Sequence, residues 1–168
     1  HLGDDYLAQA DYGRALEFYQ KSLIAVVNDF DNPDIYSNPQ IDSSLFDIRL
    51  LDNLKSKART LELYANEQKD KVLKLKTINI SLVTIELALH LIDNIRNNYP
   101  TEDNRFYLSE NEKETYLFAV HIASTLYSLT GDIKVTEKIY SIAQKAKSAV
   151  LRNEITENDL LYSATIHD

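Results

Sequence analysis

Residues 1–23 constrain the fold more than any other part of the chain, because they set small and aromatic side chains at fixed offsets. Leu2 and Tyr6 are four residues apart and therefore share one face of a helix. Gly3 and Ala15 are small, as residues must be where two antiparallel helices approach closely. Asp11 is suited to cap the second helix by accepting from its first free N–H groups. A generic amphipathic hairpin also has an apolar stripe, but this combination of offsets favours a more specific helix pair.

These offsets resemble those of a tetratricopeptide repeat (TPR) that has lost its first few residues. The matching residues are Leu2-Gly3-Asp4-Asp5-Tyr6 on the first helix, Asp11-Tyr12 at the turn, and Ala15, Tyr19, Ser22 and Leu23 on the second. The resemblance implies an all-α fold, an antiparallel stack of helix hairpins (an α-solenoid) with about three pairs and a short terminal helix. It also implies a binding scaffold without chemistry of its own, so we do not expect an enzyme.

The composition supports a single helical domain with a core. Three Gly and three Pro among 168 residues are too few for a turn-rich all-β fold, and long runs without either favour helices. Hydrophobic residues make up 44% of the chain, which argues against disorder. The net charge of −8 argues against a nucleic-acid partner and mildly favours a basic one, although solubility explains an acidic surface equally well.

The same composition excludes or disfavours several kinds of site. A chain without Cys has no disulfide, thiolate metal site or cysteine nucleophile. No metal-type spacing links the histidines, which are His1, His90, His121 and His167. Neither a phosphate-binding glycine loop nor a nucleophile elbow occurs. We therefore expect no catalytic residue, no metal and no cofactor.

The sequence constrains the cellular location of the protein only weakly. No apolar run approaches the length that spans a bilayer, so we expect no membrane insertion. The chain contains no Met and begins at His1 inside an expected helix, which indicates a piece excised from a longer protein. An acidic chain without Cys is compatible with the cytoplasm, which is the expected location.

Hydrophobic periodicity and breaker residues predict six helices in three pairs. We expect them at about 1–10 and 12–28, 45–68 and 70–98, and 109–129 and 132–153. The domain then divides into a first repeat (1–28), a loop (29–43), a second and divergent pair (44–99), a third pair (107–153) and the start of a linker helix (156–165). The connection inside the middle pair is expected to be longer than in a standard repeat.

Local signals predict where several helices begin and end. Ser43 or Ser44 is expected to cap the third helix, and Pro100 to end the fourth. An acidic linker, 101–105, should follow. Ser109 and Glu112 then form a capping-box pattern that predicts a helix start.

Further signals lie in the last third of the chain. Gly131 is expected to stop the fifth helix and Asp132 to open the sixth. The segment Thr156-Glu157-Asn158-Asp159 repeats the capping pattern and predicts a separate short helix.

Apolar residues at helical spacing mark the expected core. The third helix presents Leu50, Leu51, Leu54, Ala58, Leu61 and Tyr64, and the fourth carries a stripe typical of burial along one side, namely Leu75, Ile78, Leu82, Ile85, Leu89 and Ile92. Five tyrosines are expected in the core (Tyr6, Tyr19, Tyr64, Tyr127 and Tyr140), whereas Tyr36 and Tyr107 are expected to be more exposed. Tyr127, Gly131, Asp132, Tyr140 and Ala143 echo the first repeat.

The whole chain also resembles the TPR segment that precedes the caspase-like domain of bacterial CHAT-domain proteins. Three stretches carry this resemblance: the first repeat with the Asp-Asn-Pro-Asp-Ile-Tyr-Ser-Asn-Pro loop after it, residues 87–96, and residues 143–151. It implies a regulatory or substrate-recruiting arm in cis to a hydrolase, whose catalytic residues belong to the downstream domain. Ser81 and Thr136, where the repeat prefers Ala, and the long connection in the middle pair are departures that put the regularity of the superhelix in question.

Placing the TPR motif on this sequence predicts a ligand-binding concave face, lined by the first helix of each pair. Its candidate residues are Asp4, Leu7 and Ala8, then Lys55, Arg59 and Glu62, then His121, Thr125 and Ser128. The expected partner is an extended or helical peptide, or an adjacent domain in cis. Two alternatives stay open: a structural spacer between domains, and a small-molecule sensor with a pocket under loop 29–43. Lining residues that cluster by charge would favour binding, and mixed charges would favour the spacer.

Overall fold

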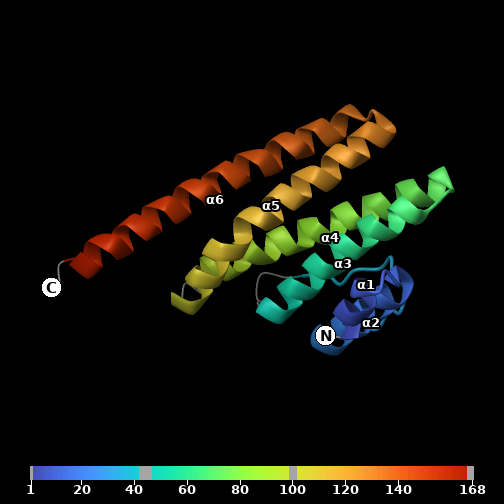
Figure 1. Ribbon diagram of the computed structural model, residues 1–168, viewed down its shortest axis with the longest axis horizontal. Coiled ribbons are helices and arrows are strands. Elements are labelled where there is room, and N and C mark those ends of the chain that lie inside the picture. Colours follow the sequence, from blue (N-terminus) through green and yellow to red (C-terminus); the bar gives the residue numbers. More distant parts are fainter. Residues whose placement is uncertain (1, 42–46, 99–101, 166–168) are drawn as a thin grey trace.

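The computed structural model describes residues 2–41, 47–98 and 102–165, and this part of the chain is all-α. Its helices are α1 (Leu2–Ala8), α2 (Tyr12–Val26), α3 (Ile48–Glu67), α4 (Lys71–Asn98), α5 (Glu102–Thr130) and α6 (Ile133–Thr165). Each helix packs antiparallel against the next one in sequence, so that the molecule steps from the α1–α2 hairpin at one edge to α6 at the other (Figure 1).

The first hairpin closes tightly, as its small residues predict. A Cβ atom on Gly3 would lie 2.7 Å from Cε1 of Tyr19, and Ala15 on α2 is fully buried. The Tyr19 hydroxyl donates to Asp4 Oδ1 at 2.7 Å. Asp11 is the N-cap of α2 and accepts from the Arg14 N–H, which confirms the predicted cap.

The core lies where α4 packs between α3 and α5. The predicted apolar residues of α3 from Leu50 to Leu61 are buried, and Tyr64 is half-buried. The α4 stripe is buried too, with Leu75 partly so, but Thr77, Thr84 and Leu91 are also buried. The expectation that α4 is buried along only one side is therefore wrong, because the helix packs against both α3 and α5.

The middle pair has a short connection, and the expected long one is wrong. Three residues, 68–70, separate α3 from α4, and Asp70 Oδ1 accepts from the N–H groups of Val72 and Leu73. At the crossing of the two helices, the buried Ser81 hydroxyl donates to the Ala58 carbonyl at 2.7 Å. The departure from Ala at position 81 thus adds an inter-helix hydrogen bond.

The predicted start of the fifth helix is wrong. α5 is already helical from Glu102, so most of the expected linker 101–105 is helix and Ser109 lies in its interior. Glu112 forms an ion pair with Arg96 of α4, which is a different role from that of a capping box. The end of α5 is as predicted: Gly131 has a φ of 66° and its N–H donates to the Tyr127 carbonyl.

α6 is one continuous helix, so the predicted break between 153 and 156 is wrong. Its start is as predicted, since Asp132 Oδ1 accepts from the Lys134 N–H. No Gly or Pro occurs between 133 and 165, and nothing in that stretch forces the helix to end. α3 is capped by Asp47, while Ser43, Ser44 and Pro100 lie outside the described residues.

The loop after α2, described to residue 41, packs onto the helices around a buried lysine. The Lys57 ammonium donates to Gln20 Oε1, to the Ser37 carbonyl and to Asn38 Oδ1 at 2.6, 2.6 and 3.0 Å. Asn38 in turn donates to Thr84 of α4. The space beneath this loop is therefore filled by polar side chains of the protein itself.

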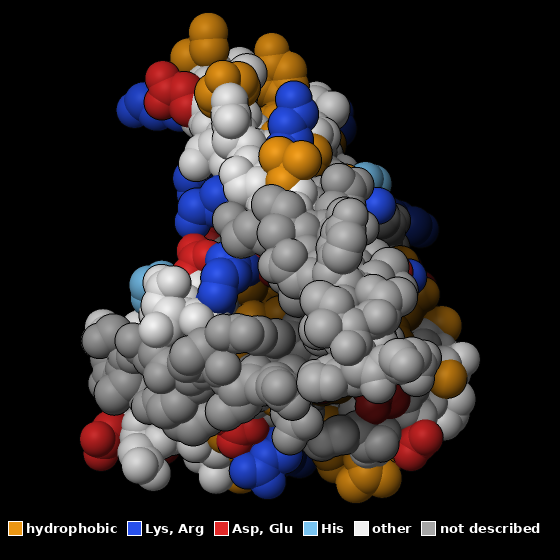
Figure 2. Space-filling view, turned by 90° about the vertical axis from the view of Figure 1, so that its left-hand side faces the viewer, with side chains coloured by type: hydrophobic (Ala, Val, Ile, Leu, Met, Phe, Trp, Pro, Cys, Tyr) orange, Lys and Arg blue, Asp and Glu red, His pale blue; other side chains and the backbone are white. Residues whose placement is uncertain are grey.

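Hydrophobic side chains are exposed at the α5–α6 end of the molecule. They gather at the top of the view in Figure 2, and the residues on these two helices are Leu117, Tyr127, Leu129, Ile133, Tyr140 and Leu151. The expectation of a core position is thus wrong for Tyr127 and Tyr140, and Tyr140 is 68% exposed. Tyr6, Tyr36 and Tyr107 are half-buried. Tyr140, which matches Tyr19 of the first repeat in the sequence pattern, is therefore exposed where Tyr19 is buried.

Within the described residues, α4 is long and apolar enough over Lys71–Asn97 to cross a membrane by length and composition alone. The expectation that no run approaches that length is wrong. Its most apolar stretch is 56% buried against the neighbouring helices. Packing in a protein core explains the same composition, so α4 carries no argument about a membrane.

Candidate binding face on α1, α3 and α5

The candidate face starts with a pocket of about 420 Å³ between the first hairpin and α3. Its lining consists of Asp4, Tyr19, Arg49, Asp52, Asn53, Lys55 and Ser56. The α3 residues among these are spaced by three or four, so they share one side of that helix. The pocket therefore brings two of the predicted residues, Asp4 and Lys55, to one place.

A second pocket, of about 180 Å³, continues the face between α3 and α5. It is lined by Lys55, Ser56, Arg59, Ile85, Glu114, Thr115 and Phe118. Lys55 and Ser56 line both pockets, so the two pockets adjoin along α3; together they are called the polar groove. Arg59, exposed in this groove, has no ion-pair partner among the described residues.

The groove is crossed by side-chain contacts between α3 and α5. The Tyr107 hydroxyl donates to Asp52 Oδ1, and the Lys55 ammonium donates to Asn111 Oδ1 at 3.4 Å. Further along, His121 Nε2 lies 2.7 Å from Glu62 Oε1. The predicted residues Glu62 and His121 therefore contact each other directly.

Six of the nine predicted residues line neither pocket: Glu62 and His121, and four others. Leu7 and Ala8 are on α1, half-buried and exposed respectively, and line neither pocket. Thr125 is half-buried on α5, and the exposed Ser128 donates to the Ser124 carbonyl within its own helix. The two pockets thus bring together Asp4, Lys55 and Arg59. Glu62 and His121 contact each other further along α3 and α5, and the other four residues lie apart.

Sequence reasoning missed the polar residues Asp52, Asn53 and Ser56. Asp52 lies three residues before Lys55, and Ser56 lies three residues before Arg59, so helix periodicity along the predicted α3 would have found both. Asn53 gave no such signal, because it is almost wholly buried and its amide donates to the Tyr19 carbonyl at 3.3 Å. Its Oδ1 is buried without a hydrogen-bond partner in the described part of the chain.

Burial shapes the electrostatics of the groove. Desolvation raises the pKa of Tyr19, and the adjacent Asp4 raises it further. Desolvation likewise raises the pKa of Tyr107, with Asp52 adding to the effect. Both phenols therefore remain hydrogen-bond donors at neutral pH. The charged residues lining the groove include both signs.

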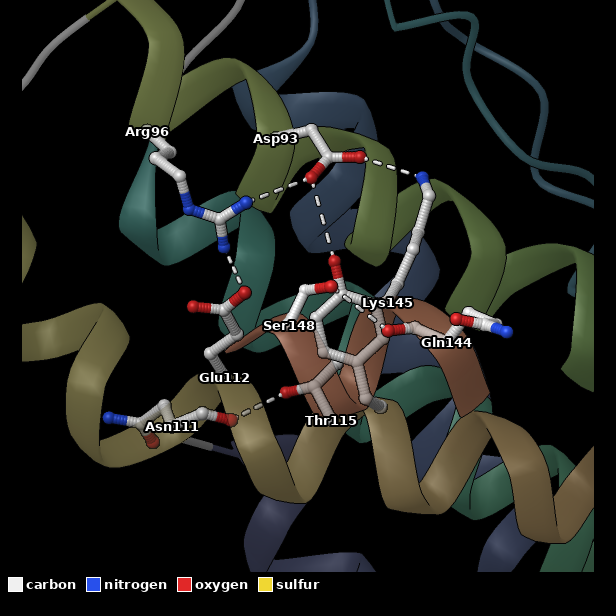
Figure 3. A network of polar contacts seen from close by, with 9 residues as sticks. Asp93, Arg96, Asn111, Glu112, Thr115, Gln144, Lys145 and Ser148 are labelled. Carbon is white, nitrogen blue, oxygen red and sulfur yellow. Dashed lines mark hydrogen bonds and ion pairs between the residues drawn. The ribbon is translucent and has the colours of Figure 1, made fainter. Parts of the chain in front are cut away.

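A second polar cluster joins α4, α5 and α6 (Figure 3). Asp93 accepts from Arg96 Nη1 at 3.1 Å and from the Lys145 ammonium at 2.9 Å, while Arg96 also pairs with Glu112. The Tyr116 hydroxyl lies 3.5 Å from Asp93, and burial together with the nearby carboxylates raises the pKa of Tyr116 to about 12. Because the charges are paired, the cluster is best explained as a structural clamp between three helices.

Comparisons with known proteins do not assign the chain to a family: no family model, no curated protein and no solved structure matches it. Within the described residues, no group of three or more His, Asp or Glu side chains is arranged to hold a metal ion.

Proposed function

We propose that this chain is a protein-interaction scaffold that binds an extended or helical peptide along the groove on α1, α3 and α5. The observation that carries the proposal is that the two pockets adjoin and share Lys55 and Ser56 in their linings. Their linings include Asp4, Lys55 and Arg59, all selected from the TPR motif, which supports the proposal.

One feature of the groove favours an acidic ligand. Arg59 offers five N–H donors with no ion-pair partner among the described residues, and planar guanidinium groups bind carboxylates well. A peptide with Asp or Glu side chains supplies such a carboxylate.

The proposal extends to the wider architecture. The tight Gly3–Tyr19 contact and the sequential antiparallel packing support a TPR-like α-solenoid. By its resemblance to the TPR segment of CHAT-domain proteins, the chain would act as a regulatory or substrate-recruiting arm of a caspase-like domain, in the cytoplasm. In that case the ligand is a substrate protein or the adjacent domain in cis.

The test is a selection of peptides from a displayed random library on the purified chain, followed by calorimetric titration of an enriched peptide. We expect the Arg59→Glu change to weaken binding by about tenfold or more, because it reverses one charge in the groove. The melting temperature should shift by less than about 1 °C, since Arg59 is exposed. Affinity capture with the same pair of proteins then identifies the natural partner.

Lys71→Glu is the matched control, because Lys71 is an exposed cation on α4 outside both pockets. It should bind the peptide as the wild type does. Equal binding by the Arg59→Glu variant, or its unfolding, would refute the assigned face.

The mixed charges of the groove favour a second candidate, a structural spacer. Contacts such as Glu62–His121 and Asp52–Tyr107 tie α3 to α5 and stiffen the molecule without any ligand. If the chain is a spacer, the peptide selection should enrich no peptide whose binding depends on Arg59. This should hold for the chain alone and for the chain with an adjacent domain attached.

A further inference from the structure

An apolar groove of about 460 Å³ lies between α5 and α6, on a different face from the polar groove. On α5 it is lined by Leu117 and Val120, whereas the polar groove uses Glu114 and Phe118. Adjacent positions on a helix differ by about 100° of rotation, so the two grooves occupy separate sides of α5. A ligand in one groove therefore leaves the other open.

Small residues create this groove. Ala143 and Ala146 of α6 form part of its lining, where longer side chains would fill the space between the helices. Leu117 and Leu151 stand at its sides, 53% and 60% exposed. These are large apolar groups in contact with solvent, and they cost free energy unless another surface covers them.

The charged residues among the described lining of the groove are of one sign. They are Lys113 on α5 and Lys147 on α6, and no Asp or Glu belongs to the described part of the lining. Neither ammonium has an ion-pair partner in the described part of the chain. A basic rim is distinctive on a chain whose net charge is −8.

The shape and the charge of the groove distinguish three possible occupants: a helix of a partner protein, a bilayer surface and a second copy of this chain. A groove between two helices accommodates the cylinder of a third helix, whereas a flat bilayer surface is better matched by a protruding apolar ridge. A symmetric second copy would bring the same lysines of both molecules together, which is repulsive. An amphipathic helix with carboxylates beside its apolar stripe satisfies both the leucines and the lysines.

We propose that the α5–α6 groove is a docking site for an acidic amphipathic helix of a partner protein. The apolar stripe of that helix lies on Ala143, Val120 and Leu117, and its glutamates or aspartates face Lys113 and Lys147. The proposal is independent of the peptide-binding function assigned to the polar groove.

The test uses a displayed library of amphipathic helices about 18 residues long, a length of five turns. The apolar face is fixed, and the flanking positions vary among Glu, Lys, Gln and Ala. Selection is run on the wild-type chain and, in parallel, on Ala143→Leu, which fills the groove without changing its charge. We expect the wild type alone to enrich helices, and their flanks to be rich in Glu.

An enriched helix is then titrated against variants whose folding is checked by circular dichroism. The Lys113→Glu/Lys147→Glu pair should weaken binding by about tenfold or more, because two attractions become repulsions. The control pair Lys69→Glu/Lys71→Glu changes exposed cations elsewhere and should remain within about twofold of the wild type. Affinity should fall as salt is raised.

Several results would overturn the proposal. Enrichment of neutral or basic flanks would remove the charge argument, and equal enrichment on Ala143→Leu would place binding elsewhere. Binding to anionic vesicles but to no helix would identify a membrane site. A doubling of the mass in light scattering, abolished by Leu117→Glu, would identify a second copy as the occupant.

Discussion

Gly3 is the residue at which one added methyl group conflicts most directly with the packing. Its Cβ would lie 2.7 Å from the ring of Tyr19, which is buried and held by Asp4. We predict that Gly3→Ala lowers the free energy of unfolding by about 1 to 3 kcal/mol, measured by urea denaturation. Gly13→Ala is the control: nothing lies within 4 Å of its Cβ, so it should be neutral or stabilising by up to about 1 kcal/mol. Equal effects of the two changes would contradict the close approach of α1 and α2.

Lys57 is the buried titratable residue that fastens the loop to the helices. Burial lowers the pKa of Lys57 to about 7, and the charge of Asp34 acts in the opposite direction. Between that value and the ordinary lysine pKa of about 10.4, the unfolded chain binds a proton that the folded chain lacks. The free energy of unfolding should therefore rise with pH in this window, by up to about 1.4 kcal/mol per pH unit.

Urea denaturation of the wild type and Lys57→Met between about pH 7 and pH 8.5 measures this rise, because tyrosines with an ordinary pKa of about 10 remain almost fully protonated there. The rise should be smaller in the Lys57→Met variant. Lys71→Met, at an exposed position, should keep the wild-type slope. A slope unchanged by Lys57→Met would show that Lys57 does not carry the pH dependence.

At the scale of helices, the Arg96–Glu112 pair couples α4 to α5. The Glu112 side chain is only 3% exposed, and removing its charge takes away one of the two carboxylates that pair with Arg96, the other being Asp93. We predict that Glu112→Gln lowers the free energy of unfolding by about 1 to 2 kcal/mol. Glu114→Gln, two residues away and exposed, should change it by less than about 0.5 kcal/mol. Thermal and urea denaturation check both, and a silent Glu112→Gln would remove the pair from the account of helix packing.

Helix existence could be predicted from sequence, whereas several helix ends could not. Asp11 and Gly131 act as expected because a cap and a left-handed glycine are local structures. Ser109 and Thr156 show the same local pattern, yet both lie inside continuous helices. A capping box stabilises a helix start but does not create one, and no Gly or Pro interrupts the chain around either residue. Near Ser109, the Arg96–Glu112 pair also holds this part of α5 against α4.

At the scale of the whole molecule, the candidate face depends on two things: the periodicity within each helix, which the sequence shows, and the spacing between helices, which it does not. Asp4, Lys55 and Arg59, which motif registration selected, line the two pockets, since registration needs only the helix periodicity. The other six selected residues line neither pocket, because the positions of the pockets depend on the spacing between helices. The apolar α5–α6 groove was not predicted for the same reason, since Leu117 and Ala143 form one groove only through the spacing of α5 and α6.

Chemical-shift mapping of the isotope-labelled chain with a selected peptide tests the central claim of groove binding most directly. We predict that the perturbed amides cluster along α3, from Asp52 to Glu62, and on the facing residues Glu114 to His121 of α5. The Arg59→Glu variant should lose these perturbations while keeping the spectrum of a folded protein. Perturbations confined to α2, α4 and α6, or a spectrum that no selected peptide changes, would contradict the assignment of a binding face to α1, α3 and α5.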